Sequence, residues 1–407
     1  MKILFLVDEF PPFAYTSGAK VMYYFAVELR KRGYEIFVIT SIQDKTKVGR
    51  EFWNGLNIFR IYSNYHPRWR TWFGLCNPQT IFKIKKIIKE IRPDIINSRH
   101  IHIYLSFYSL KIAKKYAKAV FFMANNVLLF SYTKLMPKNG KCLYKVSVWD
   151  QIKQARKRYN PFRGLIIRHC LKYIDKIFAV SNSLKKLLEI NNIKNIEVIY
   201  NGMNVIDWQT ESGKIVKFKE KYGLLDKKVL FFGGRLSGAK GGEQILNALA
   251  LIKKGIEDVI LLVVGEQNQY VEQMKATVKQ LNLEDNVIFT GWLGGDDLKA
   301  AYHGVDVVVV PSCYFDPLPM TNFEAMACKK PVVGTCFGGT PELVQDGVTG
   351  YVVNPFDVEL MANKIIDLLK NPQKAQSFGE AGYNLVKTKF SIEKQVDKIL
   401  EQYYKFL

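Results

Sequence analysis

Four side chains of this 407-residue sequence have the types and the spacing to hold a phosphorylated ligand. Arg235 and Lys240 stand in the glycine-rich stretch FFGGRLSGAKGG, and Asp316 and Glu324 follow with seven residues between them. A guanidinium binds a pyrophosphate as a fork, and an ammonium binds it as a point charge. A carboxylate accepts two hydroxyl hydrogen bonds at once, which is how a ribose diol is held. These residue types therefore favour a pyrophosphate and a ribose diol as ligands.

Other interpretations of the same residues stay open. Paired carboxylates can act as the acid and the base of a hydrolysis reaction, and Glu324 can simply stand in a first helical turn, where the dipole favours it. The glycine-rich stretch differs from a Walker loop because no Ser or Thr follows Lys240, and it can also be a solvated basic loop. Near the N-terminus, Ser17 and Gly18 precede a helix and can face a phosphate, but their loop lacks the GxGxxG of a dehydrogenase.

Short apolar runs alternate with helical patterns along the whole chain. The runs of the first half are KILFLV, EIFVIT, DIIN, AVFFMA, KIFAVS and IEVIY, and those of the second are KVLFFGG, VILLVVG, NVIFTG, VDVVVV and PVVGT. We interpret them as strands, and the segments between them as helices with one apolar face. This α/β alternation predicts parallel sheets covered by helices. Ligands of such sheets bind beyond the carboxyl ends of the strands, where the four side chains stand.

Length and charge both indicate two domains. A chain of 407 residues is too long for one ordinary core, and residues 1–200 hold 36 Lys and Arg against 12 Asp and Glu, whereas residues 201–407 hold 23 against 25. The strand and helix alternation restarts after the turn pair Asn201-Gly202. We predict one Rossmann-like domain over 1–202 and another over 203–390, with an amphipathic helix over 391–407 that packs back onto the first.

Composition excludes several classes of protein. A content of 48% apolar and 13% aromatic residues excludes a mainly disordered chain. No apolar run approaches the ~18 residues that a spanning helix needs, and the run at the N-terminus is too short for a signal peptide. The six cysteines are scattered without metal-binding spacing, so we expect reduced thiols in a cytoplasm and no metal site.

Motifs of the second half carry a resemblance to a known family. FFGGRLSGAKGG, the spacing of Asp316 and Glu324, EAMACKKPVV and FGGTPELVQDGVTGYVV resemble the retaining family-four, or group 1, glycosyltransferases. PPFAYTSGAK, AVSNSLKKLL and VIYNGM extend the resemblance over most of the chain. It implies a B-type fold of two facing Rossmann-like domains with parallel sheets, the first for the acceptor and the second for the donor. It also implies transfer of a hexose from a nucleoside-diphosphate sugar to a hydroxyl of a glycan or lipid-linked acceptor, with the anomeric configuration kept.

The resemblance assigns roles to individual residues. Arg235 and Lys240 would bind the donor diphosphate, Glu324 would hold the nucleotide ribose, and Asp316 would lie near the donor sugar. The further donor-binding residues that it implies are Ser17, Gly18, Gly234, Gly265, Glu266, Trp292, Leu318, Met320 and Thr321.

The sequence departs from the family pattern at three places. Asp316 stands where the family usually has Glu, so its side chain is one methylene shorter. Leu318 and Pro319 stand where a Phe-Gly pair is common, and Pro319 has no N–H to donate. The family commonly presents a His after the strand that we identify as DIIN, and we choose His100 as the catalytic candidate. The neighbouring alternatives in NSRHIH are Asn97, Arg99 and His102.

The basic first half suggests an anionic partner. Its Lys and Arg alternate with Tyr, Trp and Phe, which favours docking on anionic lipid at the inner face of the cell membrane, although lysine-rich helices can also merely keep a domain soluble. Nucleic-acid binding would use the same charge, but the basic segments carry no recognised nucleic-acid motif, so we expect no nucleic-acid partner. A non-catalytic sugar-nucleotide binder remains the alternative, because of the departures at Asp316 and Pro319. No D-x-D triplet occurs, and two cations can stand in for magnesium, so we expect no cofactor.

Overall fold

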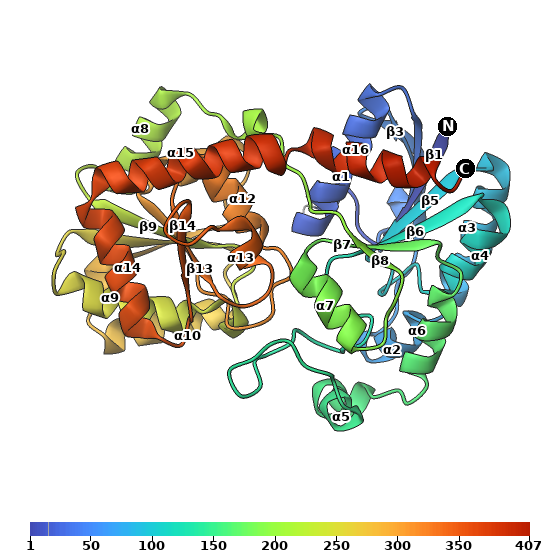
Figure 1. The fold of residues 1–407 in the computed structure, drawn as a ribbon, viewed down its shortest axis with the longest axis horizontal. Helices are drawn as coiled ribbons and strands as arrows, with labels where there is room; N and C mark the ends of the chain where they lie inside the picture. The colour runs from blue at the N-terminus through green and yellow to red at the C-terminus, as the bar shows by residue number, and fades with distance from the viewer. Residues whose placement is uncertain (15) are drawn as a thin grey trace. The chain divides into compact units, whose positions relative to one another are not determined.

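The computed structural model describes residues 1–14 and 16–407, so Tyr15 of the PPFAYTSGAK motif lies outside the described residues. Figure 1 shows the chain coloured from its N-terminus to its C-terminus. Contacts divide it into two compact units. The first comprises Met1–Lys134, Leu143–Gly202 and Ile392–Leu407, and the second comprises Leu135–Cys142 and Met203–Ser391. Residues 135–142, assigned to the first domain from sequence, count with the second unit because the Phe315 N–H donates to the Leu135 carbonyl oxygen at 2.8 Å.

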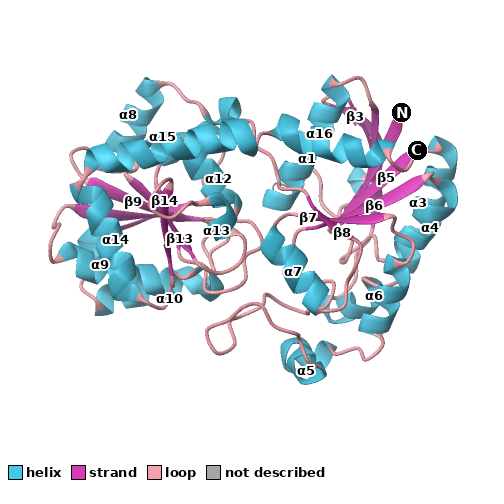
Figure 2. Ribbon diagram, in the orientation of Figure 1, coloured by secondary structure: helices cyan, strands magenta, loops and turns pink. Residues whose placement is uncertain are grey.

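The first unit is built on an eight-stranded sheet with the order β3-β4-β2-β1-β5-β6-β7-β8. Figure 2 shows its strands in magenta among cyan helices. Its strands are β1 (Lys2–Val7), β2 (Glu35–Ile42), β3 (Gly49–Trp53), β4 (Leu56–Tyr62), β5 (Ile95–Arg99), β6 (Ala119–Ala124), β7 (Lys176–Ala179) and β8 (Ile196–Val198). Neighbours pair in parallel, except for the antiparallel β3 and β4. This hairpin turns at Asn54 and Gly55, both with positive φ. The prediction lacks these two strands, although an Asn-Gly pair is a strong hairpin signal.

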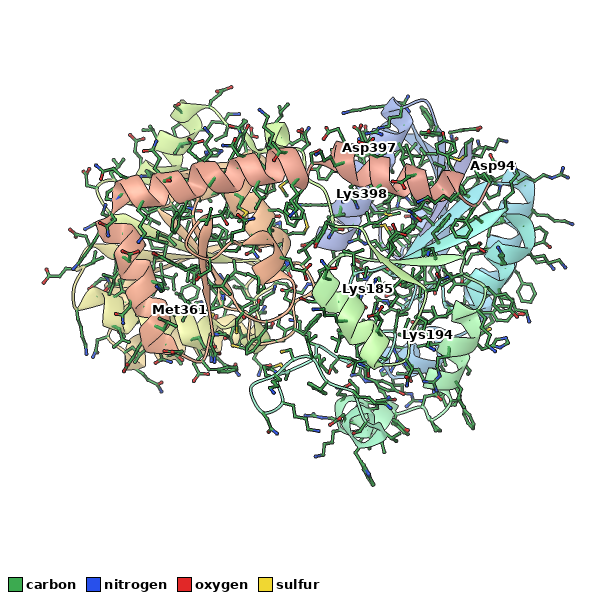
Figure 3. All side chains as sticks on the ribbon, in the orientation of Figure 1. Asp94, Lys185, Lys194, Met361, Asp397 and Lys398 are labelled. Atoms are coloured by element: carbon green, nitrogen blue, oxygen red, sulfur yellow. The ribbon has the colours of Figure 1, made fainter. Side chains whose placement is uncertain are left out.

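The first unit also contains helices, the last of which lies near the end of the given sequence. The helices are α1 (Ser17–Lys31), α2 (Arg70–Phe73), α3 (Pro78–Ile91), α4 (Tyr108–Tyr116), α5 (Val148–Ala155), α6 (Arg163–Leu171), α7 (Asn182–Ile190) and α16 (Ile392–Tyr404). The last helix buries one apolar face in the core of this unit, made of Ile392, Val396, Ile399, Leu400 and Tyr403. Asn97 of β5 donates to the Tyr403 hydroxyl at 2.6 Å. On the same helix, Asp397 (labelled in Figure 3) accepts a hydrogen bond from Arg32, which follows α1.

The second unit is built on a six-stranded, wholly parallel sheet with the order β11-β10-β9-β12-β13-β14. Its strands are β9 (Lys228–Gly233), β10 (Val259–Val264), β11 (Val287–Gly291), β12 (Val307–Val310), β13 (Val332–Thr335) and β14 (Gly350–Val353). Its helices are α8 (Ser212–Lys221), α9 (Gly242–Lys253), α10 (Gln269–Gln280), α11 (Gly295–Gly304), α12 (Met320–Ala327), α13 (Thr340–Leu343), α14 (Val358–Lys370) and α15 (Pro372–Lys389). Short 3-10 turns of the chain are η1 (Lys45–Lys47), η2 (Pro67–Trp69), η3 (Arg156–Arg158), η4 (Val205–Trp208), η5 (Gly238–Lys240) and η6 (Glu284–Asn286).

Burial explains why these runs form strands in the second unit. Every residue of β10 and of β12 is buried. A strand covered on both faces by helices has no solvent-facing positions, so it reads as a continuous apolar run. Met361 of α14, labelled in Figure 3, packs into the same core. The α/β fold class with parallel sheets, predicted from the alternation, is confirmed.

Within residues 1–14 and 16–407, no helix combines the length and the apolar character needed to cross a membrane.

Candidate active site

Lys240 and Asp316 form the centre of the candidate site in the second unit. The Lys240 Nζ donates to Oδ2 of Asp316 at 2.8 Å, and the Tyr314 hydroxyl donates to the same oxygen at 2.7 Å. Lys240 ends the turn that follows β9, whereas Asp316 lies on the loop after β12. Because β9 and β12 are parallel neighbours, their carboxyl ends meet at one edge of the sheet, which brings the two loops together.

Glycines allow these loops to approach closely. Gly241 has φ +86°, and a Cβ at this position would lie 2.0 Å from the carbonyl oxygen of Pro311. Gly338, after β13, has φ +78°, and a Cβ there would lie 1.9 Å from the carbonyl oxygen of Asp316. Both positions need glycine for conformation and for space. The Gly339 N–H then donates to the same Asp316 carbonyl at 2.9 Å, so three loops hold Asp316 in place.

The surroundings of Lys240 keep its side chain charged. Burial disfavours the ammonium and by itself would lower its pKa, but Asp316 and Tyr314 outweigh burial, so the pKa of Lys240 lies above its ordinary value. The side chains of Lys240 and Asp316 are only 17% and 10% exposed. Burial and the adjacent Asp316 raise the pKa of Tyr314, which therefore stays a neutral hydrogen-bond donor. Lys240 is therefore charged at neutral pH, and its ammonium has further N–H groups for a ligand besides the one that Asp316 accepts.

Arg235 lies at the surface of the same loop. Its side chain is exposed, and Gly234 before it has φ +113°. The backbone of Gly234 donates to Val264 at 2.9 Å, and a Cβ at Gly265 would lie 2.5 Å from the Gly234 carbonyl oxygen. The loops after β9 and β10 are therefore packed backbone to backbone, with the long Arg235 side chain at their surface. An exposed guanidinium has all its N–H groups available to an anion.

Three of the predicted donor-binding residues, Gly265, Glu266 and Trp292, lie beyond β10 and β11. Glu266 follows the buried Gly265 and is exposed, and Trp292 follows β11 with 57% of its surface exposed. The Gly265 N–H donates to the carbonyl oxygen of Gly291 at 3.0 Å, which joins the two loops. The exposed indole offers a stacking face, and the exposed carboxylate offers hydrogen-bond acceptors.

Glu324 does not stand in the first turn of its helix, so that interpretation of the residue is wrong. Helix α12 begins at Met320 after Pro319, so Glu324 is its fifth residue, and no acidic residue stands in its first turn. The helix dipole thus does not explain Glu324. Its Oε2 accepts a hydrogen bond of 2.6 Å from the hydroxyl of Tyr302, a buried side chain of α11. Burial and the Glu324 charge both raise the pKa of Tyr302, so this hydroxyl remains a donor that orients the carboxylate.

Three further predicted residues surround the start of α12. Leu318 is buried, with 6% of its surface exposed, so only its backbone can reach a ligand. Met320 and Thr321 are the first two helical residues, whose N–H groups have no acceptor one turn earlier within the helix. Pro319 at the N-cap has no side-chain acceptor to cover them. Helix α12 therefore begins four residues after Asp316 without a side-chain cap.

In the first unit, His100 and Gly18 are in contact. His100 directly follows β5 with φ +50°, and a Cβ built on Gly18 would lie 3.4 Å from its Nε2. Helix α1 begins at Ser17, with Thr16 as its N-cap, so Ser17 and Gly18 belong to the first turn rather than to the loop before it. Glycine at the second helical position leaves room for the imidazole. The helix start and His100 therefore share one location at the carboxyl end of the sheet.

The alternatives to His100 serve other contacts. Asn97 is buried against Tyr403, and Arg99 is a buried side chain whose pKa is lowered to about 10 by burial. The imidazole of His102 lies with its ring centroid 5.3 Å from that of His100. His100 is thus the member of NSRHIH that contacts the start of α1.

Sequence reasoning missed the residues that orient the site. Tyr302 and Tyr314 each donate to one of the predicted acids, and Asp8 at the end of β1 accepts from the N–H groups of Ile103, Tyr104 and Leu105 at 2.7–2.9 Å. Asp8 thereby holds the loop after His100. Tyr314 stands two residues before Asp316, a spacing that could have suggested the contact.

The described residues contain no group of three or more His, Cys, Asp or Glu side chains able to hold a metal ion.

Comparison with solved structures defines the class of the fold. A crystal structure of HepE from Anabaena in complex with UDP superposes with a TM-score of 0.75 at 19% identity, covering 100% of both chains. Sucrose-phosphate synthase from Thermosynechococcus elongatus superposes with a TM-score of 0.80 at 20% identity, covering 99% of this chain and 98% of that chain. The fold is that of the two-domain, B-type glycosyltransferases.

Sequence comparison identifies the family. The model of glycosyl transferases group 1 matches residues 215–385, and that of glycosyltransferase family 4 matches residues 18–206. A putative glycosyltransferase of Bacillus subtilis strain 168, YtcC, is 32% identical over 307 residues, which are 71% of this chain and 73% of that protein. An uncharacterized glycosyltransferase of Methanocaldococcus jannaschii is 27% identical over 382 residues, 89% of this chain and 87% of that protein. This chain belongs to the group 1 glycosyltransferases.

Proposed function

We propose that this glycosyltransferase moves a hexose from a nucleoside-diphosphate sugar to an acceptor hydroxyl and retains the anomeric configuration. The observation that carries the proposal is the buried pair of Lys240 and Asp316, joined at 2.8 Å on loops that meet at the carboxyl edge of the second sheet. A charged ammonium fixed in a largely dry site, with the exposed Arg235 on the same loop, suits a diphosphate that gains charge as it leaves.

Each candidate site residue of the second unit then has a defined role in the transfer. Arg235 and Lys240 stabilise the departing diphosphate, and because they are already in place, no reorganisation is needed as charge develops. Glu324, oriented by Tyr302, accepts hydrogen bonds from the ribose diol. Asp316 and the backbone N–H groups at the start of α12 bind hydroxyls of the donor sugar. In the first unit, His100 is the proposed catalytic residue.

Two relatives support a nucleotide sugar as the donor. HepE was crystallised with UDP, and a relative from Mycolicibacterium smegmatis is named a GDP-mannose-dependent mannosyltransferase, with 33% identity over 172 residues, 41% of this chain and 45% of that protein. Both ligands are nucleoside diphosphates or their sugars, but they differ in the base. The proposal therefore specifies the diphosphate and the sugar transfer, and leaves the base to experiment.

We expect transfer without a divalent cation, because Arg235 and Lys240 supply the positive charge at the diphosphate. A thermal-shift panel of nucleoside diphosphates and their hexoses would first identify the donor, since a ligand that binds the native state raises Tm. Hexose transfer to acceptors would then be measured with and without EDTA. Activity that EDTA abolishes and magnesium restores would contradict metal independence. Donor binding without turnover in the presence of any acceptor would identify a non-catalytic binder instead.

The first unit also carries a surface suited to a membrane. Trp149 on α5 is 74% exposed and Leu165 on α6 is 61% exposed. Residues of both helices line one cavity, so the helices lie side by side. Exposed cations stand on and between these helices, among them Lys153, Lys157 and Arg168. Apolar side chains among cations match the interface of an anionic bilayer, where each cation contributes about 1 kcal/mol. We place the enzyme on the inner face of the cell membrane, in the synthesis of polysaccharide or lipid-linked glycan.

Sedimentation with vesicles tests this placement. We expect the chain to pellet with anionic vesicles at low salt and to be released at high salt, because a Debye length falls from ~10 Å at 0.1 M to ~3 Å at 1 M. Trp149→Ser should weaken the pelleting, whereas Trp53→Ser, a half-buried tryptophan of β3, serves as the matched control. Equal recovery in the supernatant with anionic and neutral vesicles would exclude the membrane surface.

A further inference from the structure

The first unit contains a cavity that none of the residues proposed above to bind the donor lines. Its volume is about 240 Å³, several times the ~30 Å³ that a water molecule occupies in the liquid. Arg70 follows β4, His102 follows β5 and Tyr132 follows β6, so the cavity lies among loops at the carboxyl edge of the sheet. Arg158 of η3 and Arg163 of α6 complete the wall. Ligands of parallel sheets bind at this edge.

The described residues that line the cavity carry positive charges but no negative ones. Arg70, Arg158 and Arg163 line it, and no Asp or Glu is among its described lining residues. Over residues 1–14 and 16–407, none of these three guanidinium groups lies within ion-pair distance of a carboxylate. Cations gathered in a concave site without a counter-charge repel one another, and an anion relieves this repulsion.

Arg163 is the most deeply placed of the three. Only 8% of its surface is exposed, its guanidinium donates to the Leu128 carbonyl oxygen, and it lies 4.5 Å from the centroid of the Tyr132 ring. Burial lowers the pKa of Arg163 to about 10; the Tyr132 hydroxyl raises it, and Arg70 lowers it further. A buried guanidinium is costly unless hydrogen-bond acceptors satisfy its donors. One carbonyl accounts for one of its five N–H groups.

A buried hydroxyl in the same wall lacks an acceptor. Thr71 Oγ1 has no hydrogen-bond partner among the described residues, although most buried polar atoms have one. His102 beside it is neutral at physiological pH, because burial and the neighbouring His100, Arg70 and Arg163 place its pKa well below the ordinary value. The cavity therefore offers guanidinium and hydroxyl donors that match a group with several anionic oxygens.

The backbone around the cavity is tightly packed. A Cβ at Gly74 would lie 2.4 Å from the carbonyl oxygen of His102 and 2.8 Å from that of Arg70, so only glycine fits between them. The Phe107 N–H donates to the Gly74 carbonyl at 2.9 Å, and the Tyr132 hydroxyl donates to that of Asn160 at 2.9 Å. Walls held in this way bind a ligand without first becoming ordered, which improves affinity.

We propose that this cavity binds a phosphoryl group of the acceptor, held by Arg70, Arg158 and Arg163 with the Thr71 hydroxyl as a further donor. The inference rests on the proposed function, in which the first unit takes the acceptor. Three guanidinium groups suit a phosphate better than a carboxylate, since a phosphate has more oxygens and carries up to two charges. His102 lines the cavity, and its ring centroid lies 5.3 Å from that of His100. A phosphate in the cavity would therefore lie close to the catalytic candidate His100.

Calorimetric titration of the full chain with inorganic phosphate tests the site without a donor sugar. We expect Arg70→Gln and Arg158→Gln each to raise the Kd of phosphate about tenfold, the effect of losing one charge-assisted hydrogen bond. Arg156→Gln is the matched control, because Arg156 is an exposed arginine of the same η3 turn outside the cavity lining. It should change the Kd less than about twofold, since it removes the same charge but no hydrogen bond. Phosphate can also bind at the donor site, so Arg70→Gln should raise the Kd to the same extent in a chain that carries Arg235→Ala.

Three results would each overturn the proposal: undetectable phosphate binding to the native chain, equal losses for Arg156→Gln and Arg158→Gln, or a loss confined to Arg235→Ala. Glycerol phosphate and phosphatidylglycerol vesicles then distinguish a soluble acceptor from a lipid headgroup. Binding of glycerol phosphate is measured by titration. Binding of phosphatidylglycerol vesicles is measured by pelleting, which Arg70→Gln should weaken and Arg156→Gln should not. Phosphate binding that follows these variants in a chain that transfers no sugar would reject the proposed function and keep the anion site.

Discussion

Arg235→Ala is expected to lower kcat about 10²–10³-fold, a loss of roughly 2.7–4 kcal/mol of transition-state stabilisation. The guanidinium stands on the loop between β9 and α9, beside the turn that ends with Lys240. Its contact with the leaving diphosphate strengthens as charge develops, so the loss should fall on kcat rather than on KM alone. Steady-state kinetics with the identified donor measures both.

The fold should not change with this substitution. Arg235 is exposed, and substitutions at such positions usually alter the free energy of unfolding by less than about 0.5 kcal/mol. Arg235→Lys keeps the positive charge but loses the forked guanidinium. Its kcat should therefore lie between that of the native chain and that of Arg235→Ala. Lys254→Ala, an exposed cation just beyond the far end of α9, is the control and should behave as the native chain. An Arg235→Ala variant with native kcat would remove the diphosphate role.

Lys240→Met is expected to reduce both stability and activity. The substitution leaves the Asp316 carboxylate, with its side chain 10% exposed, without its cation. Breaking a buried pair in this way costs about 3–5 kcal/mol of unfolding free energy. Chemical denaturation followed by linear extrapolation measures this cost. The kcat should fall together with the free energy of unfolding, because the ammonium at the diphosphate is lost.

The pH dependence follows from the direction of the Lys240 pKa. Because the folded state raises this pKa, the pair contributes its full stability below the pKa of an ordinary lysine, about 10.4, and loses it only as the pH rises through the raised value. The difference between native and variant chains should therefore be constant across neutral pH. A difference that vanished at pH 7 would contradict a charged Lys240.

Two further variants separate charge pairing from packing. Lys240→Met combined with Asp316→Leu removes both charges and should regain much of the stability while remaining inactive. Lys214 and Asp296 form a pair of similar length, 2.6 Å, with 45% and 53% of their side chains exposed. Lys214→Met should therefore change the stability little. Equal destabilisation by Lys214→Met and Lys240→Met would mean that burial of the pair is not the cause.

The sequence alone predicted the elements whose signal is local. Fully apolar runs such as VILLVV of β10 indicate strands buried on both faces, and the period of the apolar residues in 391–407 indicates α16. The β3–β4 hairpin was missed because its strands carry few continuous apolar residues, despite the Asn54-Gly55 turn. Family motifs pointed to Arg235, Lys240, Asp316 and Glu324, since these residue types and their spacing are visible along the chain.

Tertiary structure decided which groups meet and with what charge. That Lys240 binds Asp316 depends on β9 pairing with β12, a contact between residues 76 positions apart in the chain. The start of α12 at Met320 moved Glu324 out of the first turn, and Tyr302 reached it from another helix. The arginine cavity needed loops after three different strands. Such contacts depend on the order of strands in a sheet, which local residue patterns do not encode, whereas burial and periodicity are properties of each segment.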